Sequence, residues 1–281
     1  MRIGIRGHDV KKGTPRDLAL GIKKAGFTST QLVLPKAIWR ESFFPLIKMD
    51  LDIYDLKRVF DEIGVQVAML GAYFNPVHSN KEKVAEGVEN FKDHLKRAKL
   101  FGTELVGTET GSYHDDVWTW HERHASEEAF QEVLRIFKDL LPVAEAAGTY
   151  LTIEPAYHHV ISTPERLKRL VLALDSPNVR VIFDLFNLLH QGNTHEQRQL
   201  IDEMVECFND QIAVVHAKDF VLKEGKLVQV APGKGEMDYP YLIAKLRTLQ
   251  TSPDLILEGV TGEDIPFSRD YLIKLLNESR S

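Results

Sequence analysis

A short motif recurs along the first half of this chain, in which a helical segment ends at a glycine and an apolar run follows at once. The glycines are Gly26, Gly64, Gly102 and Gly148. Glycine just past a helix end adopts the left-handed conformation that closes the last turn without steric cost. Each apolar run has the length of a strand that is buried on both faces. The chain therefore begins as an alternation of helices and strands.

The second half keeps this alternation but separates the elements by other breakers, such as Ser176-Pro177 and Ser252-Pro253. Together with the opening segment, eight strands are expected, at residues 2–6, 31–34, 67–70, 105–107, 150–153, 179–183, 212–215 and 255–257. In the second half, helices are expected at residues 164–174, 196–208, 239–249 and 267–277. The first of these four has Thr163 as its N-cap and proline at its first position, a typical helix start.

Eight strand–helix pairs in 281 residues leave about 35 residues for each pair, which suits a (β/α)8 barrel. No linker rich in proline or serine interrupts the series. We therefore expect an α/β protein whose residues 1–281 form a single-domain (β/α)8 TIM barrel. An open, doubly wound sheet is the alternative.

Composition restricts the partners of such a barrel. With 35 Lys+Arg against 41 Asp+Glu, the net charge of −6 lacks the footprint of a duplex-DNA binder. The apolar runs fall short of the roughly 20 residues that span a bilayer, and the N-terminal segment has a charge inside its apolar stretch, unlike a signal peptide. A single cysteine, Cys207, excludes a disulfide framework. We expect a cytoplasmic protein without nucleic-acid or membrane partners.

Charged residues stand where the later strands end. The last four expected strands are followed by Glu154, Asp184, His216 and Glu258, and the carboxyl ends of barrel strands converge on the face that carries the active site. Three carboxylates in a poorly solvated cavity would repel one another, and a divalent cation removes this conflict. Such a donor set suits Mn2+ best, with Mg2+, Co2+ or Zn2+ as further candidates. The alternative is that these four polar residues are unrelated. A metal site is favoured, because all four consecutive strands end in a residue that can bind a metal.

The segments around these residues carry a resemblance to a known family. They are residues 153–155, 183–187, 216–219, 232–239 and 257–258. Their sequences resemble the xylose isomerase-like superfamily of sugar phosphate isomerases and epimerases, and within it the ketose and hexulose-phosphate 3-epimerases. The resemblance implies that Glu154, Asp184, His216 and Glu258 together hold one divalent metal.

The resemblance also implies a reaction, namely epimerisation or isomerisation of a sugar or sugar phosphate by proton transfer next to its carbonyl group. A metal on the carbonyl and the neighbouring hydroxyl would stabilise the enediolate. Glu154 and Glu258 would then act as the acid/base pair from opposite faces, while Asp184 and His216 would only hold the metal. The expected partner is a small sugar, and the sequence leaves the oligomeric state open, a homo-oligomer included.

Several other residues are candidates for contacts with the substrate. Asn187, one turn beyond Asp184, is placed to bind a hydroxyl, and Lys218 either contacts substrate or pairs with a carboxylate. Glu109 has three interpretations: a hydroxyl-binding group, an acceptor for His216, or an ion-pair partner of Arg6, itself a candidate at the end of the first strand.

The loops add further candidates. His158 follows Glu154 closely enough to reach a substrate, and Trp118 lies in the loop 112–125, which is either a lid or a segment that packs its tryptophans on a helix. Gly233-Lys234-Gly235 fits either a phosphate site or a tight turn. Asp219 is expected to order its loop.

Three other functions compete. A cyclitol (inosose-type) dehydratase or isomerase would use the same metal site, and only the fate of the enolate would differ. A non-catalytic sugar-binding barrel would keep both glutamates without using them. An apurinic-site endonuclease with three zinc ions is disfavoured, because Asn187 stands where that class has histidine and residues 226–229 offer no Asp-x-His motif.

Overall fold

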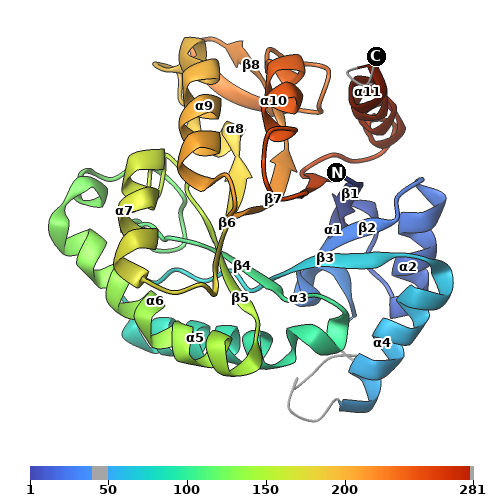
Figure 1. Cartoon of the computed structure of the whole chain (residues 1–281), viewed down its shortest axis with the longest axis horizontal. Coiled ribbons are helices and arrows are strands. Elements are labelled where there is room, and N and C mark those ends of the chain that lie inside the picture. Colours follow the sequence, from blue (N-terminus) through green and yellow to red (C-terminus); the bar gives the residue numbers. More distant parts are fainter. Residues whose placement is uncertain (40–49, 279–281) are drawn as a thin grey trace.

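The computed structural model of the chain describes residues 1–39 and 50–278, and its parallel strands close into a barrel that helices surround (Figure 1). The barrel strands are β1 (Ile3–Arg6), β2 (Ser29–Leu32), β3 (Gln66–Gly71), β4 (Leu105–Glu109), β5 (Tyr150–Glu154), β6 (Val179–Asp184), β7 (Ile212–Ala217) and β10 (Asp254–Leu257). They follow one another in chain order, and β10 pairs with both β7 and β1. The closure confirms the expected (β/α)8 barrel and excludes an open sheet.

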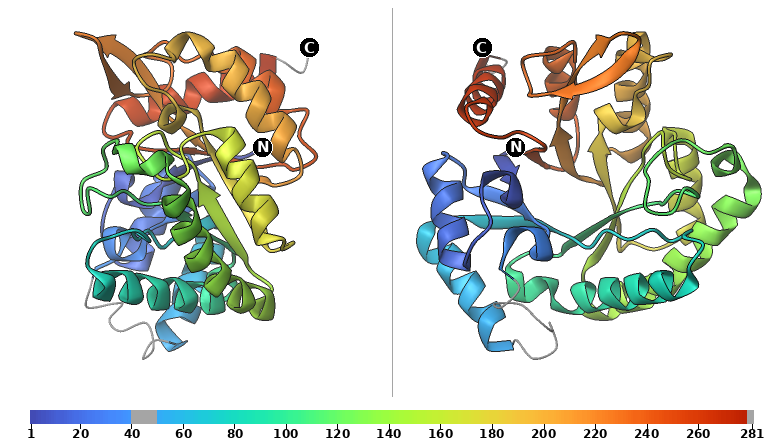
Figure 2. Two further views of the ribbon diagram at one scale, coloured as in Figure 1. Left: turned by 90° about the vertical axis from the view of Figure 1, so that its left-hand side faces the viewer. Right: turned by 180° about the vertical axis from the view of Figure 1, so that it is seen from behind.

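The long helices lie outside the barrel, as both views of Figure 2 show. They are α2 (Pro15–Lys24), α4 (Asp50–Ile63), α5 (Lys81–Arg97), α6 (Glu127–Ala147), α7 (Pro164–Leu174), α9 (Gln197–Phe208), α10 (Tyr239–Leu246) and α11 (Asp264–Glu278). Short helical turns are α1 (Gly7–Val10), η3 (Ala98–Phe101), α3 (Leu34–Ala37), η4 (Glu122–Ala125), α8 (Leu185–Leu188) and η5 (Thr194–Glu196). Over residues 1–39 and 50–278, no helix has the length and apolar character needed to span a membrane.

Local signals in the sequence place many of these boundaries. The four helix-ending glycines have φ between 63° and 88°, the left-handed region that disfavours residues with a Cβ. Helix α7 has the expected bounds, because the Thr163 side chain accepts a hydrogen bond from the backbone N–H of Arg166 and Pro164 occupies the first turn. The other late helices match within about three residues at each end, the usual scatter of such boundaries.

The interior of the barrel is packed and leaves no channel. Side chains from β3, β6, β7 and β10 form a small apolar cluster there, separate from the larger core beneath the helices; it comprises Ala68, Met69, Ile182, Val214 and Ile256. A Cβ at Gly107 would lie 2.7 Å from the Met69 side chain, so a larger residue at position 107 would displace Met69. A ligand therefore has to bind at an end of the barrel.

Strand β2 lies two residues earlier than expected. Residues 31–34 were predicted from the apolar run, but β2 spans Ser29–Leu32, and Leu34 already begins the short helix α3. The buried residues Ser29, Thr30 and Gln31 are polar, which hid the strand from a reading based on hydrophobicity. The register pairs Gln31 with Arg6 of β1, near the carboxyl end of the barrel.

An antiparallel hairpin follows β7. It was not predicted from the sequence. It consists of β8 (Asp219–Lys223) and β9 (Lys226–Val230), and in Figure 2 it projects from the barrel. Its turn residues Glu224 and Gly225 both have positive φ, at 51° and 74°, as in the two-residue turns that match the twist of a hairpin.

Asp219 at the start of this hairpin orders the loop that leads to α10, as expected. Its carboxylate is buried and accepts hydrogen bonds from four backbone N–H groups, those of Phe220, Gly233, Gly235 and Met237. Lys234 in turn pairs with Asp264. The N–H groups proposed for a phosphate are therefore already occupied, so the phosphate interpretation of residues 233–235 is wrong and the tight turn is right.

We expect Asp219→Asn to lower the free energy of unfolding by about 2–4 kcal/mol, because an amide group placed at Oδ2 would face the N–H groups of Gly233 and Gly235 and leave buried donors unpaired. Urea denaturation followed by circular dichroism measures the change. Asp210→Asn, at an exposed aspartate, is the matched control. Equal stability of the two variants would show that the carboxylate does not hold the loop.

Candidate active site

Three carboxylates and an imidazole meet at the carboxyl ends of β5, β6, β7 and β10. Nδ1 of His216 lies 3.1 Å from Oε1 of Glu154, 3.5 Å from Oδ2 of Asp184 and 3.0 Å from Oε2 of Glu258. Glu154, Asp184 and His216 are at most 2% exposed, whereas the Glu258 side chain is 15% exposed. The four residues expected at the strand ends are thus brought together around one nitrogen atom, and Glu258 reaches the solvent-accessible side.

The donor atoms fit a metal ion. One ligand atom each from Glu154, Asp184 and His216 lies within 4.8 Å of the other two, and Glu258 approaches the same nitrogen of His216. Oδ2 of Asp184 is buried and forms an ion pair with Nζ of Lys218 at 2.7 Å. A buried carboxylate oxygen that has a cation beside it is a suitable ligand for a metal ion.

Gln31 fixes the orientation of the imidazole. Its Oε1 lies 2.7 Å from Nε2 of His216, and its amide donates to the hydroxyl of Tyr73. A carbonyl oxygen can only accept, so Nε2 carries a proton and Nδ1 is the nitrogen that remains to bind a metal. Gln31 was not among the predicted site residues. A polar residue inside a strand that should be apolar was the available signal.

The carboxylates of the cluster hold its cations in their charged forms. Burial by itself would lower the pKa of His216, but Glu154 and Glu258 raise this pKa well above its ordinary value. Burial also opposes the charge of Lys218, whose pKa Asp184 and Glu258 nevertheless raise. In the protein without metal, the imidazolium and the lysine ammonium therefore balance the acids.

Two predicted residues connect the cluster to its surroundings. Asn187 donates to Oε1 of Glu154 at 2.8 Å and accepts from Nζ of Lys218 at 3.2 Å. Lys218 also lies 3.1 Å from Oε1 of Glu258, so the alternative in which this lysine pairs with carboxylates agrees with the structure. These bonds orient both glutamates.

Arg6 contacts the cluster from the other side. It pairs with Oε1 of Glu258 at 2.9 Å and with Asp9 at 2.9 Å. An ion pair between Arg6 and Glu109 was one expectation. This expectation is wrong, because Arg6 directs its N–H groups to Glu258 and Asp9 instead. Arg6 is also not among the residues that line the cavity described next.

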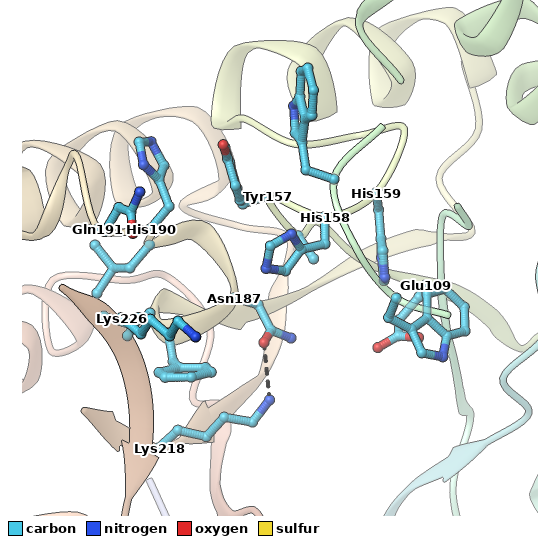
Figure 3. A pocket seen from close by; sticks show the side chains of 15 residues that line it. Glu109, Tyr157, His158, His159, Asn187, His190, Gln191, Lys218 and Lys226 are labelled. Carbon is cyan, nitrogen blue, oxygen red and sulfur yellow. Dashed lines mark hydrogen bonds between the residues drawn. The ribbon is translucent and has the colours of Figure 1, made fainter. Parts of the chain in front are cut away.

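A cavity of about 610 Å³ opens beside the cluster. Five of the predicted residues line it, namely Glu109, Trp118, His158, Asn187 and Lys218. Figure 3 shows Asn187 and Lys218 turned toward each other, with Glu109 near His159. Asn187 and Lys218 touch the acids of the cluster, so the cavity floor adjoins the candidate metal ligands.

Glu109 differs from the other acids because its carboxyl group forms no hydrogen bond or ion pair with any described residue. Burial, reinforced by Glu154 and Glu258, raises its pKa to about 8. It is not an acceptor for His216, since the two ring nitrogens of that residue face Gln31 and the other acids. Of the three interpretations, hydroxyl binding is the one that the geometry leaves.

The loop 112–125 presents its tryptophans to the cavity. Trp118 and Trp120 are 40% and 49% exposed, and both line the cavity. Trp118 packs on the ring of His159, with the centroids 4.5 Å apart. The alternative in which both indoles pack on a helix is therefore wrong.

Solved structures of other proteins share the fold of this chain. In the solved structures, the fold is similar to a D-tagatose 3-epimerase-like protein (TM-score 0.76, 19% identity, 100% of both chains). It is also similar to 3-keto-D-glucoside 4-epimerase from E. coli (TM-score 0.72, 19% identity, 98% of both chains). A third similar structure is the IOLI protein with a bound zinc atom (TM-score 0.71, 18% identity, 100% of this chain and 96% of that one).

The sequence itself matches the profile of a protein family over residues 21–275, nearly the whole chain. That family is described as the xylose isomerase-like TIM barrel. The closed barrel of parallel strands agrees with this match. The chain therefore belongs to the xylose isomerase-like TIM barrel family.

Proposed function

We propose that the protein is a divalent-metal-dependent sugar epimerase or isomerase. The observation that carries the proposal is the convergence of Glu154, Asp184 and Glu258 on Nδ1 of His216, beside a cavity large enough for a sugar. Structures with the same fold include sugar epimerases and a zinc-bound protein.

Glu154, Asp184, His216 and Glu258 would hold the metal, and their donor set of oxygens with one nitrogen favours Mn2+ over softer ions. When bound, a divalent cation polarises the carbonyl of the substrate and acidifies the neighbouring C–H bond. Nε2–H of His216 donates to Gln31, which keeps Nδ1 directed at the three carboxylates.

Glu154 and Glu258 are proposed as the proton-transfer pair. Glu154 ends β5 and Glu258 directly follows β10, and these strands are separated by β6 and β7 around the barrel. Their carboxylates therefore reach Nδ1 of His216 from different strands. Asn187 holds Oε1 of Glu154, while Arg6 and Lys218 hold Oε1 of Glu258. One glutamate removes the proton next to the carbonyl, and the other returns a proton to the opposite face.

The remaining residues of the floor are proposed to bind hydroxyl groups of the sugar. The carboxyl group of Glu109 faces the cavity without a partner, and His158 lies at the wall. Asn187 has hydrogen-bonding capacity beyond its contacts with Glu154 and Lys218.

We expect Glu154→Gln and Glu258→Gln each to lower turnover by about 10²–10⁴-fold, because an amide cannot transfer the proton. Exchange of the substrate C–H for deuterium in D2O, with saturating Mn2+ and a panel of ketoses, measures this directly. Glu206→Gln, at an exposed glutamate, should exchange normally. A dehydratase would instead release water from the substrate. Full deuterium exchange by both active-site variants would exclude the scheme in which the two glutamates transfer the proton.

Replacing Gln31 by leucine should weaken Mn2+ binding by about 10–100-fold, the usual effect of losing a hydrogen bond to a metal-ligating histidine. Gln31→Glu, which keeps an acceptor for Nε2 of His216, should restore most of the affinity. Titration calorimetry measures both values, with the exposed Gln250→Leu as control. Unchanged affinity in Gln31→Leu would mean that the imidazole is oriented without this residue.

Binding of Mn2+ should release about one proton at neutral pH. Although burial opposes it, Glu154 and Glu258 hold the pKa of His216 well above its ordinary value, so the ring is protonated below that pKa and must lose a proton to bind a metal. The affinity should therefore rise up to about tenfold per pH unit. Calorimetry in buffers of different ionisation enthalpy counts the protons. Release should persist in the control His195→Asn, at an exposed histidine, and zero release by the native protein would contradict this assignment.

A further inference from the structure

The cavity is larger than the proposed reaction requires. A ketohexose has twelve non-hydrogen atoms, and even if each took the volume of a liquid water molecule, about 30 Å³, the sugar would fill only about 360 Å³. The cavity measures about 610 Å³. A substantial part of it therefore lies beyond any single sugar ring that reaches Asn187 and Lys218 at the floor.

Aromatic side chains line much of the cavity. Trp118 and Trp120 come from the loop after β4, and Tyr157 and His158 come from the segment after β5. Indole rings with 40% and 49% exposure are costly to leave in water, and they mark a surface that a ligand covers. The C–H faces of a sugar ring or the face of an aromatic ring match such walls.

The loop that carries the tryptophans is fixed at its base. Both carboxylate oxygens of Asp115 accept hydrogen bonds from Ser79, at 2.8 Å from its N–H and 2.7 Å from its hydroxyl. The amide of Asn75 donates to the backbone carbonyls of Ser112 and Asp115. The loop that carries the indoles is thus held by the loop after β3, so the aromatic wall exists before a ligand arrives.

The same region is poorly suited to a phosphate group. The N–H groups of Gly233 and Gly235 bind Asp219, and the ammonium of Lys218 is engaged by Asp184 and Glu258. Lys226, on the exposed hairpin, is the other lysine that lines the cavity.

We propose that the substrate is an uncharged glycoside, whose ketose ring lies at the floor of the cavity while a second ring, joined through a glycosidic bond, packs on Trp118 and Trp120. This inference rests on the proposed function for the identity of the first ring. It adds a second subsite, a preference for two-ring substrates, and discrimination against phosphorylated sugars.

Binding of four probes to the Mn2+-loaded full-length protein tests the subsite. The probes are D-fructose, D-fructose 6-phosphate, and the ketose disaccharides lactulose and isomaltulose, each measured by titration calorimetry. At least one disaccharide should bind about tenfold or more tightly than fructose, as expected from one further ring packed on indoles. Fructose 6-phosphate should bind no more tightly than fructose.

Variants assign the effect to the indoles. Trp118→Ala and Trp120→Ala should each weaken disaccharide binding by about five- to tenfold and leave fructose binding within about twofold. Trp39→Phe, at the one tryptophan that does not line the cavity, should change neither. Equal binding of fructose and the disaccharides would overturn the proposal. Tighter binding of fructose 6-phosphate that Lys226→Ala abolishes would replace the second ring by a phosphate.

Deuterium exchange on the same probes separates the two hypotheses. If the disaccharides bind through the tryptophans but no probe exchanges a proton, the subsite stands and the proposed epimerase activity falls. If fructose exchanges and neither binding nor exchange favours a second ring, the activity stands and the subsite falls.

Discussion

The mutual repulsion of three carboxylates, two of them buried, is the constraint that organises this protein. Parallel strands in a closed barrel deliver the residue at each carboxyl end to the same small volume, and here the register sets Asp184 beside His216 and Glu109 beside Glu154. Burying these acids without positive charge would cost several kcal/mol for each one. The imidazolium of His216 and the ammonium of Lys218 supply part of that charge. A divalent cation would supply it more compactly, which is why we propose a metal site here.

The arrangement of these charges also depends on three further side chains, the uncharged Gln31 and Asn187 and the cation Arg6. Gln31 determines which nitrogen of His216 faces the acids, and Asn187 joins Glu154 to Lys218. Arg6 is shared between Glu258 and Asp9. Each of these side chains stands on or directly after a different barrel strand, so the cluster forms only when the barrel is closed. Folding and assembly of the site are therefore one event, and a variant that loosens closure, such as a Cβ added inside the barrel, should damage both.

The features that the sequence predicted well are those with a local physical cause. Helix α7 was placed correctly because Thr163 and Pro164 define its start within two residues, and the acids at the strand ends stand out because apolar strands precede them. The errors have non-local causes. Gln31 contacts a histidine 185 residues away, and a buried polar strand such as β2 has no hydrophobic pattern. The hairpin β8–β9 was missed because its short apolar runs were taken as part of the connection between β7 and α10. Residues 233–235 looked like an anion site until Asp219, fourteen residues earlier, proved to be the anion.

The segment from His216 to Asp219 shows how this fold separates chemistry from specificity. His216 faces the acids, Lys218 neutralises two of them and lines the cavity, and Asp219 anchors the loop toward α10. Directly after it, the hairpin β8–β9 contributes Lys226 and Leu227 to the outer cavity. Four consecutive residues thus fix the position of the hairpin relative to the cluster. The hairpin and the loop 112–125 can then vary in sequence without disturbing the acids, because their anchors, Asp219 and Asp115, bind backbone N–H groups and Ser79 rather than any cluster residue. Differences in substrate among barrels of this kind are therefore expected in these two loops, while the strand ends retain the proton chemistry.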